Sequence, residues 1–329
     1  MPRPKVGVVI PAPLRATLFS PADIARLEKI AEVVYNDTDQ HLDTAQAAAH
    51  LADCRVGIGS WGTPYPDAEL LPACPALKLW VHAAGTVKRM FGPHLEGRDL
   101  TIASCAPAIA ENVAEITLGQ LIIGLKRTLE NGGANRNGRT GKPANSRSLA
   151  ACTIGVVGAS QVGRRTIRNL KPFGPKILLC DPYVSAEEAA SLGAEKVEDL
   201  TELCRRIDAL TSHVPATPST NKIFGAEQFK ALPDDAVFVN TARGASVDED
   251  ALIAELEKGR LFAFLDVSDP EPTADDSPLR RLPNVVYTSH IAGGADFKIG
   301  AQAVGDIEAF LEGREPAMAV TPDMLERIA

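Results

Sequence analysis

The sequence of 329 residues lacks the features of several large classes of protein. Its six cysteines include no Cys-x-x-Cys pair, and several lie in apolar runs, so we expect reduced core cysteines rather than a disulfide framework. A basic excess is also absent, because the formal net charge is −8 and the Lys and Arg residues are scattered. This charge balance argues against nucleic acid or an anionic membrane as a partner.

Targeting and membrane signals are missing as well. Met1–Lys5 leads directly into a strand-like run, without the apolar region and small-residue cleavage site of a signal peptide. We expect no apolar stretch long enough to span a bilayer. No low-complexity tract or fixed-period repeat is found. Together with the cysteines, these absences predict a cytoplasmic protein with no membrane partner.

What is present is a regular alternation of short apolar runs and helical patterns, which is typical of an α/β fold. The runs Val6–Ile10, Val56–Gly59 and Leu77–Val81 predict strands, and Pro21 opens a predicted helix. The alternation begins twice, at residue 5 and again at residue 153. With 45% apolar residues to fill the cores, the chain is expected to form two separate sheets.

Two long helices are predicted outside these runs. Ala108–Leu125 is mostly apolar, and Asn131-Gly132-Gly133 should stop the helical pattern, leaving residues 132–148 as an exposed connection. An amphipathic stripe from Phe297 to Leu311 predicts a late helix, ended by Gly313, that can cross back to the first domain. We therefore expect residues 1–105 and 295–329 to form one domain, into which residues 106–294 are inserted.

A strand beginning at Thr153 runs into a glycine-rich turn and a helix, as in dinucleotide-binding proteins. The glycines would allow a tight turn and close packing of helix on strand, and the helix N-terminus would offer N–H groups to a pyrophosphate. The strand Ile177–Cys180 ends at Asp181, whose carboxylate would bind ribose hydroxyls and repel a 2′-phosphate, which favours NAD. The expected contacts of the turn are Gly158, Ser160, Gln161, Val162 and Gly163.

Ser160 departs from the usual pattern because it replaces the middle glycine. Its Cβ would crowd the pyrophosphate, although its hydroxyl could also bond to it. The two outer glycines alone are equally consistent with an ordinary strand-to-helix turn that needs them only for packing. The flanking strand, the helix and Asp181 favour nucleotide binding.

Three ionisable side chains follow predicted strands in the last third of the chain. Arg243, Glu271 and His290 come after apolar runs that begin at Ala236, Phe262 and Val285. The carboxyl ends of parallel strands are where ligands bind in such sheets. A guanidinium can hold a carboxylate, an imidazole can transfer a proton near neutral pH, and a carboxylate can fix the tautomer of that imidazole. Singly, each has a simpler explanation: a surface ion pair, a loop acid, or a structural histidine.

Further cofactor contacts are expected around these residues. Asp266 could accept a hydrogen bond from the nicotinamide carboxamide, or could be only a turn or N-cap residue. The remaining expected contacts are His213, Val214, Pro215, Thr241, Ala242 and Gly293.

On these motifs the chain resembles the D-isomer-specific 2-hydroxyacid dehydrogenase family. The likeness is carried by Val113-Ala114-Glu115, the glycine turn with Asp181, His213-Val214-Pro215, Asn240–Gly244, Asp266-Val267 with Glu271-Pro272, and Ser289-His290. The resemblance implies two doubly wound parallel-sheet domains, with a Rossmann NAD-binding domain inserted into a flavodoxin-like substrate domain. It also implies that Arg243 binds the substrate's carboxylate and carbonyl, that His290 is the acid/base supported by Glu271, and that the protein is a homodimer.

The resemblance further places substrate-binding residues in the first domain. Backbone N–H groups around Ala84 and Gly85 are expected to bind the carboxylate. Where phosphoglycerate-type members tend to carry basic residues, this chain has Ser60-Trp61-Gly62, which weakens a phosphorylated substrate. Trp61 and His82 instead indicate a pocket with one flat apolar wall and an extra polar group. No metal is implied.

We therefore predict an NAD-dependent oxidoreductase that interconverts a D-2-hydroxyacid and its 2-oxoacid. Formate dehydrogenases resemble this fold, but Glu271 speaks against that activity. Two alternatives are an NAD(H)-sensing corepressor of the C-terminal binding protein type and a catalytically weakened member that binds cofactor poorly because of Ser160.

Overall fold

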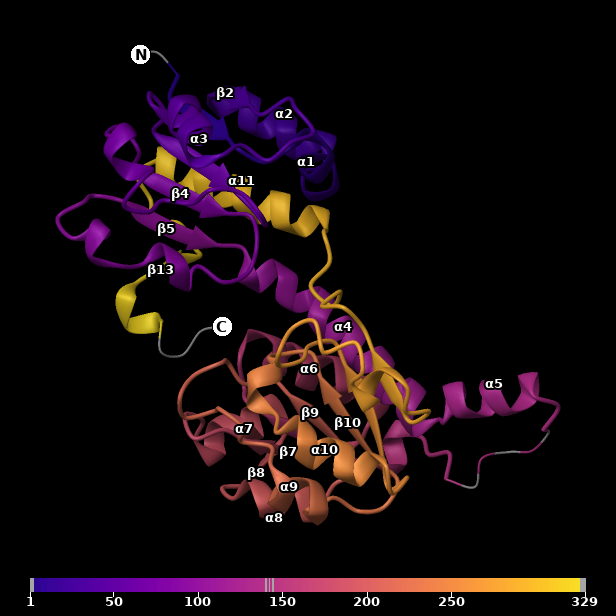
Figure 1. The fold of residues 1–329 in the computed structure, drawn as a ribbon. Helices are drawn as coiled ribbons and strands as arrows, with labels where there is room; N and C mark the ends of the chain where they lie inside the picture. Colours follow the sequence, from indigo (N-terminus) through magenta and orange to yellow (C-terminus); the bar gives the residue numbers. More distant parts are fainter. Residues whose placement is uncertain (1–2, 140, 142, 144, 326–329) are drawn as a thin grey trace. The chain divides into compact units, whose positions relative to one another are not determined.

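The computed structural model describes residues 3–139, 141, 143 and 145–325. These residues divide into two compact units. The described residues of Met1–Ile109 and Gly294–Ala329 form unit 1, and Ala110–Gly293 form unit 2. Each unit contains one sheet with helices packed against it (Figure 1). The predicted α/β fold with two sheets is confirmed.

The sheet of unit 1 has the strand order β13-β5-β4-β3-β1-β2. Strands β1 to β5 run parallel in the flavodoxin-like order 2-1-3-4-5, and β13 pairs antiparallel with β5. The strands are β1 Lys5–Val8, β2 Glu32–Tyr35, β3 Val56–Gly59, β4 Leu79–His82, β5 Thr101–Ser104 and β13 Ala319–Val320.

Unit 1 is completed by a helix that comes late in the chain. Its α-helices are α1 Ala12–Leu18, α2 Pro21–Ile30, α3 Thr44–Leu51 and α11 Phe297–Leu311. Its 3-10 helices are Leu71–Ala73, Lys88–Met90, Pro93–Leu95 and Pro322–Met324. Helix α11 contacts α2 and β4, and its residues Ile299, Val304 and Ile307 are fully buried (Figure 1). The predicted late helix therefore supplies part of the core built on the first five strands.

The sheet of unit 2 is parallel throughout its described strands, in the order β12-β11-β10-β9-β6-β7-β8. Counted within the unit, the first six strands have the Rossmann order 3-2-1-4-5-6. The strands are β6 Thr153–Val157, β7 Lys176–Cys180, β8 Glu195–Lys196, β9 Ala209–Ser212, β10 Ala236–Asn240, β11 Leu261–Leu265 and β12 Val285–Tyr287.

Apart from α5 Thr128–Arg136, the helices of unit 2 pack around this sheet. They are α6 Gln161–Leu170, α7 Ala186–Leu192, α8 Leu200–Arg205, α9 Ala226–Ala231 and α10 Glu249–Leu256, while α4 Ala106–Leu125 begins in unit 1 and continues into unit 2. The 3-10 helices are Leu149–Ala151, Lys171–Phe173, Gly244–Ser246 and Pro278–Arg280.

The sequence-based expectation for membrane spans needs one correction. Among the described residues, α4 is long and apolar enough to cross a bilayer by length and composition alone. Half of it is buried, and Leu121 and Leu125 pack into the core of unit 2. The helix is apolar because it is a core helix, so its composition is weak evidence for a membrane span.

The predicted helix stop at Asn131-Gly132-Gly133 is wrong, because α5 runs through these residues. The break between α4 and α5 lies earlier, at Arg127, whose backbone is left-handed with φ of 55°. Amide side chains stabilise the last turns of α5, since Asn135 Nδ2 donates to Asn131 O at 2.9 Å and Asn137 Nδ2 donates to Gly133 O at 3.1 Å. Figure 1 shows α5 extending away from the sheet of unit 2.

Candidate active site

The glycine-rich turn lies between β6 and α6, at the carboxyl end of an inner strand of unit 2. Gly158 has a φ of 90°, and a Cβ there would lie 2.9 Å from the carbonyl oxygen of His213. A Cβ on Gly163 would lie 2.0 Å from the carbonyl oxygen of Gly158. Both positions therefore require glycine, and the turn and helix pack as closely as a dinucleotide site demands.

Ser160, which replaces the middle glycine, is the N-cap of α6. Its backbone is extended, and its Oγ accepts a hydrogen bond from the Gly163 N–H at 3.4 Å. Within the described part of the chain, the N–H groups of Gln161 and Val162 have no acceptor. The start of α6 therefore keeps two free backbone donors for a pyrophosphate, beside a serine hydroxyl.

Asp181 lies at the end of β7 and faces this turn. Its Oδ2 accepts the Ala159 N–H at 2.6 Å, and its Oδ1 accepts the Tyr183 N–H at 2.7 Å. The carboxylate is thus held next to the pyrophosphate-binding donors, where an acid can bind the ribose hydroxyls. The turn, the free donors and the carboxylate together fit an NAD molecule, whose nicotinamide ring supplies the hydride chemistry when it is bound.

His213, a predicted cofactor contact, lies directly after β9. Its carbonyl packs against Gly158, while its imidazole is turned into the interior, with Nε2 3.1 Å from Thr211 Oγ1. Burial lowers the pKa of His213 to about 3, so the ring is neutral at physiological pH. The backbone of His213 therefore shapes the glycine turn from behind, and its side chain belongs to the core.

The loop after β10 presents Arg243. Asn240 holds this loop in a tight turn, because its Oδ1 accepts the Ala242 N–H and its Nδ2 donates to Arg243 O, each at 3.0 Å. The Arg243 guanidinium makes one hydrogen bond, from Nη1 to Ala242 O at 2.6 Å, and it forms no ion pair with a described residue. Most of its five N–H donors remain available to a ligand.

Gly244 brings the Arg243 turn into contact with the loop after β11. A Cβ on Gly244 would lie 2.1 Å from the carbonyl carbon and oxygen of Ser268. No other residue type fits there without displacing backbone. The glycine that follows Arg243 in the sequence motif is therefore needed for the two loops to touch.

The loop after β12 carries His290 and is held by Asp266, which is buried at the end of β11. Asp266 Oδ1 accepts the Thr288 hydroxyl at 2.6 Å and the Ile291 N–H at 2.9 Å, and Oδ2 accepts the Ala292 N–H at 2.8 Å. His290 itself has a left-handed backbone, with φ of 55°. Such a conformation is uncommon outside glycine and persists when the surroundings fix it, which is the role that the geometry gives to Asp266.

The imidazole of His290 meets the carboxylate of Glu271. Nδ1 of His290 lies 2.6 Å from Oε1 of Glu271, so the hydrogen bond predicted between them is present. Because an ionised carboxylate only accepts, the proton lies on Nδ1 and donates to Glu271. Nε2 is then the ring atom that can exchange a proton with a ligand. Both side chains are partly accessible, with exposed fractions of 47% and 39%.

Arg243, Glu271 and His290 follow β10, β11 and β12, which are neighbours in the sheet. Burial lowers the pKa of the Arg243 guanidinium, and the charge of Glu271 acts in the opposite direction. Glu271 therefore interacts with both the cation and the imidazole. Unit 2 thus brings together a guanidinium and an imidazole oriented by a carboxylate at the carboxyl edge of the sheet, the end at which such sheets bind ligands.

In unit 1, the loop after β4 exposes backbone donors. Ser60 Oγ donates to Ala83 O at 2.8 Å, and Ser104 Oγ donates to Gly85 O at 2.6 Å, so two serines from the flanking strands hold the loop's carbonyls. Among the described residues, the N–H groups of Ala84 and Gly85 have no acceptor. A Cβ on Gly85 would meet nothing within 4 Å. The loop is therefore able to offer N–H groups to an anion, as the family resemblance implies.

The two side chains expected to select the substrate also lie in unit 1. Trp61 is 39% exposed just after β3, and His82 ends β4. Burial lowers the pKa of His82 to about 4, and its Nδ1 has no hydrogen-bond partner among the described residues. His82 is therefore a neutral hydrogen-bonding group at physiological pH.

Several residues that shape the site were not singled out from the sequence. Ser104, Ser268, Tyr287 and Glu249 contact the site's loops through hydroxyl or carboxylate groups. Ser104 and Tyr287 end their strands, a position that the sequence does show. No cluster of potential metal ligands is found in the described residues.

Three comparisons with known proteins agree with this geometry. Residues 118–292 match the family model described as D-isomer specific 2-hydroxyacid dehydrogenase, NAD binding domain. A D-3-phosphoglycerate dehydrogenase of Methanocaldococcus jannaschii is 36% identical over 214 residues, which cover 64% of this chain and 40% of that protein. A glyoxylate reductase of Thermofilum pendens is 28% identical over 337 residues, covering 99% of this chain and 97% of that protein.

The structure also resembles the crystal structure of the TT0316 protein from Thermus thermophilus, with a TM-score of 0.74 and 28% identity over 96% of this chain and 100% of that one. The family model, which spans the glycine turn, Asp181, Arg243, Glu271 and His290, covers more than half of the chain. The protein belongs to the D-isomer specific 2-hydroxyacid dehydrogenase family and carries its NAD-binding domain.

Proposed function

We propose that the protein is an NAD-dependent oxidoreductase that interconverts a D-2-hydroxyacid and its 2-oxoacid. The observation that carries the proposal is the 2.6 Å contact between His290 Nδ1 and Glu271 Oε1, together with the Arg243 guanidinium, which feels the charge of Glu271 and uses one N–H donor at Ala242 O. Proton transfer at a substrate oxygen and binding of a carboxylate are the two tasks that this reaction leaves to the protein.

Each member of the trio has one role in this proposal. Arg243 binds the carboxylate and the oxygen of the reacting carbonyl through its remaining N–H donors. His290 donates a proton from Nε2 to that oxygen during reduction and removes it during oxidation. Glu271 accepts the Nδ1 proton, which keeps Nε2 directed away from it and stabilises the imidazolium. Bound NADH supplies the hydride, and Asp181 favours it over NADPH.

The substrate that we propose carries no second anionic group. The support is the neutral imidazole of His82, together with Ser60-Trp61-Gly62, which offers no cation for a phosphate. A neutral ring can exchange hydrogen bonds with a hydroxyl or a carbonyl, but it does not compensate a charge. Glyoxylate, the substrate named for one matched relative, fits this description, whereas a phosphoglycerate-type acid does not.

Steady-state turnover of a panel of 2-oxoacids with NADH tests the proposal. The panel contains glyoxylate, oxoacids with larger neutral side chains, and one phosphorylated oxoacid. We expect turnover of at least one oxoacid with an uncharged side chain. In His290→Asn this turnover should fall by at least about a hundredfold, while the affinity for NADH is retained. Protein that binds NADH but turns over none of these acids would contradict the proposed reaction.

A corepressor-type role finds no support among the matched relatives. A catalytically weakened member would bind NADH poorly because of Ser160. A fluorescence titration with NADH separates this case from the proposed enzyme, since the proposed enzyme binds NADH with micromolar or tighter affinity. Ser160→Gly, which restores the usual glycine, should then change the affinity only slightly, because the serine hydroxyl already caps the helix.

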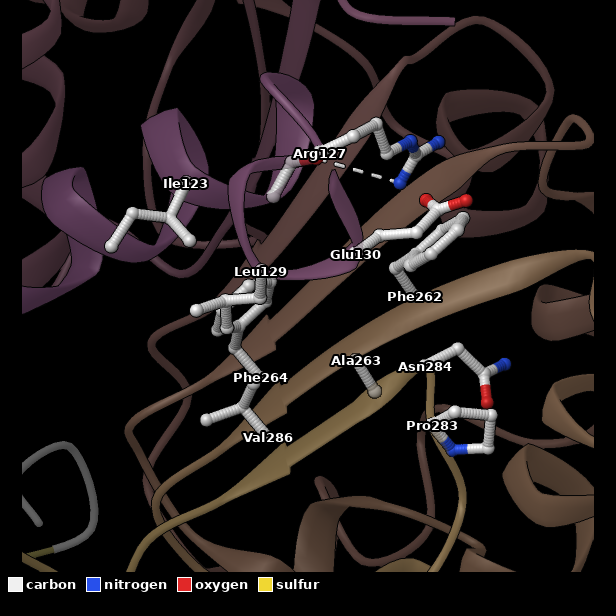
Figure 2. A pocket seen from close by; sticks show the side chains of 11 residues that line it. Ile123, Arg127, Leu129, Glu130, Phe262, Ala263, Phe264, Pro283, Asn284 and Val286 are labelled. Atoms are coloured by element: carbon white, nitrogen blue, oxygen red, sulfur yellow. Dashed lines mark hydrogen bonds between the residues drawn. The ribbon is translucent and has the colours of Figure 1, made fainter. Parts of the chain in front are cut away.

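We also propose that the protein acts as a cytoplasmic homodimer. The support for the dimer is a largely apolar hollow on unit 2, lined by residues of α4, α5, β11 and β12, with Ile123 and Leu129 exposed (Figure 2). Leu129 is 52% exposed and Ile123 is 36% exposed, so two apolar side chains are accessible together at this hollow, as at surfaces that bind a partner. Leu129→Glu should shift the mass in light scattering from dimer to monomer, while Met324→Glu, at an exposed apolar residue of unit 1, should not.

A further inference from the structure

The loop that carries Glu271 has few backbone N–H groups with which to form hydrogen bonds to the rest of unit 2. Glu271 lies between Pro270 and Pro272, neither of which has a backbone N–H group. The prolines limit the loop's own backbone angles, but they do not tie it to the sheet. Apart from the Glu271 carboxylate itself, hydrogen bonds can fix the segment through its carbonyl groups and through the few N–H groups that remain, such as that of Thr273.

One phenol holds both ends of this segment. Thr273 N–H donates to the Tyr287 hydroxyl oxygen at 3.2 Å, and the same oxygen lies 2.9 Å from Ser268 Oγ. Ser268 Oγ in turn donates to Pro270 O at 2.8 Å. Since a serine hydroxyl has a single proton and Ser268 uses it at Pro270, the Tyr287 O–H must donate to Ser268 Oγ. The donor and the acceptor of each of these three hydrogen bonds are therefore determined.

Tyr287 is itself anchored at the strand that leads to the acid/base. It ends β12, pairs in register with Leu265 of β11, and precedes His290 by three residues. Its ring packs against the core of unit 2, and the Arg280 guanidinium lies 5.7 Å from the ring centroid. Ser268 is almost completely buried. Strand β12, which leads to His290, thus also positions the Tyr287 hydroxyl that holds the Glu271 loop.

We propose that Tyr287 and Ser268 are positioning residues that hold Glu271 against His290. This inference rests on the proposed function, in which Glu271 fixes the tautomer of His290. Neither residue needs to touch the substrate or the cofactor. Without the hydroxyl pair, the exposed Glu271 loop would keep the Asp269 N–H donating to Glu249 Oε1 at 2.8 Å before the prolines, and Arg280 Nη2 donating to Thr273 O at 2.7 Å after them. Neither of these bonds reaches Ser268 Oγ or the carbonyl of Pro270.

The kinetic test is a double-mutant cycle. Tyr287→Phe keeps the ring and removes the hydroxyl with both of its hydrogen bonds, so we expect kcat to fall about fivefold or more, with the affinity for NADH unchanged. In a Glu271→Gln background, the same substitution should lower kcat by less than about twofold, because Tyr287 acts only through Glu271. Equal effects in both backgrounds would overturn the proposal. Tyr35→Phe, which removes a phenol bonded to Glu28 in unit 1, is the matched control.

A second readout needs no turnover. Nitrogen-15 NMR of labelled histidine at about pH 9, assigned with His290→Asn, reports which ring nitrogen of neutral His290 carries the proton. We expect the Nδ1–H tautomer to dominate in the wild-type protein and to lose population in Tyr287→Phe and Ser268→Ala. An unchanged tautomer ratio in both variants would overturn the positioning role, and either variant suffices if the other fails to fold. If the wild-type protein reduces no 2-oxoacid, the proposed reaction fails while this measurement still decides the positioning.

Discussion

His82 makes the stability of unit 1 depend on pH. Burial lowers the pKa of this histidine from its ordinary 6.5 to about 4. Below pH 6.5 the unfolded chain takes up a proton that the folded unit does not bind. The contribution of His82 is therefore fully present above about pH 6.5 and is lost as the pH falls toward 4.

The size of the loss follows from the two pKa values. Between pH 7 and pH 5, protonation of the unfolded chain at a site with these values costs the folded unit about 2 kcal/mol. With a urea dependence of about 2 kcal/mol per molar, the unfolding midpoint should fall by roughly 1 M. His82→Gln cannot titrate, so the part of the pH dependence that His82 contributes should disappear in that variant.

Tryptophan fluorescence provides the assay. The chain contains two tryptophans, Trp61 and Trp80, which both lie in unit 1, and Trp80 is fully buried. Urea unfolding followed by their emission therefore reports on unit 1. His41→Gln, at an exposed histidine of the same unit, checks that the effect is specific. If His82→Gln and the wild-type protein lose the same stability between pH 7 and pH 5, the imidazole is not held neutral and the proposed preference for uncharged side chains loses its support.

Three other substitutions test the geometry of unit 2. Gly244→Ala forces a Cβ to within 2.1 Å of the Ser268 backbone and should cost about 1–3 kcal/mol of unfolding free energy together with most of kcat. The control Gly119→Ala, inside α4 with nothing within 4 Å, should leave turnover unchanged and should not lower the thermal stability, since alanine favours a helix more than glycine does. Asp181→Ser should lower the affinity for NADH by about tenfold or more, since hydrogen bonds to a charged group are worth about 1.5–3 kcal/mol. It should also reduce the difference in affinity between NADH and NADPH. Unchanged dissociation constants for both cofactors would refute the contact assigned to Asp181. Asp266→Asn replaces one carboxylate oxygen by an NH2 group, so at least one of the three donors from Thr288, Ile291 and Ala292 loses its acceptor. We therefore expect kcat to fall with little change in NADH affinity. A variant with wild-type kcat would show that the His290 loop does not depend on that carboxylate.

The strands were predictable where buried runs are bounded by strong breakers. Val56–Gly59 has the predicted limits and the strand of the Arg243 loop begins at Ala236 as predicted, because each run is buried throughout and is followed by a polar turn. The first strand was extended too far, to Ile10, since Val9 and Ile10 are equally apolar but already belong to the turn into α1. Helix α1 was missed because it is short and begins beside prolines. Tertiary packing rather than hydrophobic periodicity determines where the first strand ends and where α1 begins.

For the site, the sequence indicates which side chains follow which strands, but not what holds them. The placement of Arg243, Glu271 and His290 on neighbouring strands follows from the order of a doubly wound sheet. The connection from Tyr287 through Ser268 to Pro270 could not be predicted, because it joins the end of β12 to a loop nearly twenty residues earlier in the sequence and depends on hydroxyl directions. Sequence patterns indicate which face of a helix or strand is buried and where it ends. Hydrogen bonds between side chains that are distant in the sequence depend on the three-dimensional structure.

The place of α11 in the core of unit 1 has a consequence for biosynthesis. On a ribosome, residues 110–293 emerge as a continuous segment and can fold as soon as that segment is free. The first five strands emerge earlier, yet their core still lacks Ile299, Val304 and Ile307 until the chain has been extended to Leu311. The segment made first is thus the last to be completed. During that interval the apolar surface that α11 will cover is open to chaperones and to aggregation, so premature termination between the two units would harm unit 1 far more than unit 2.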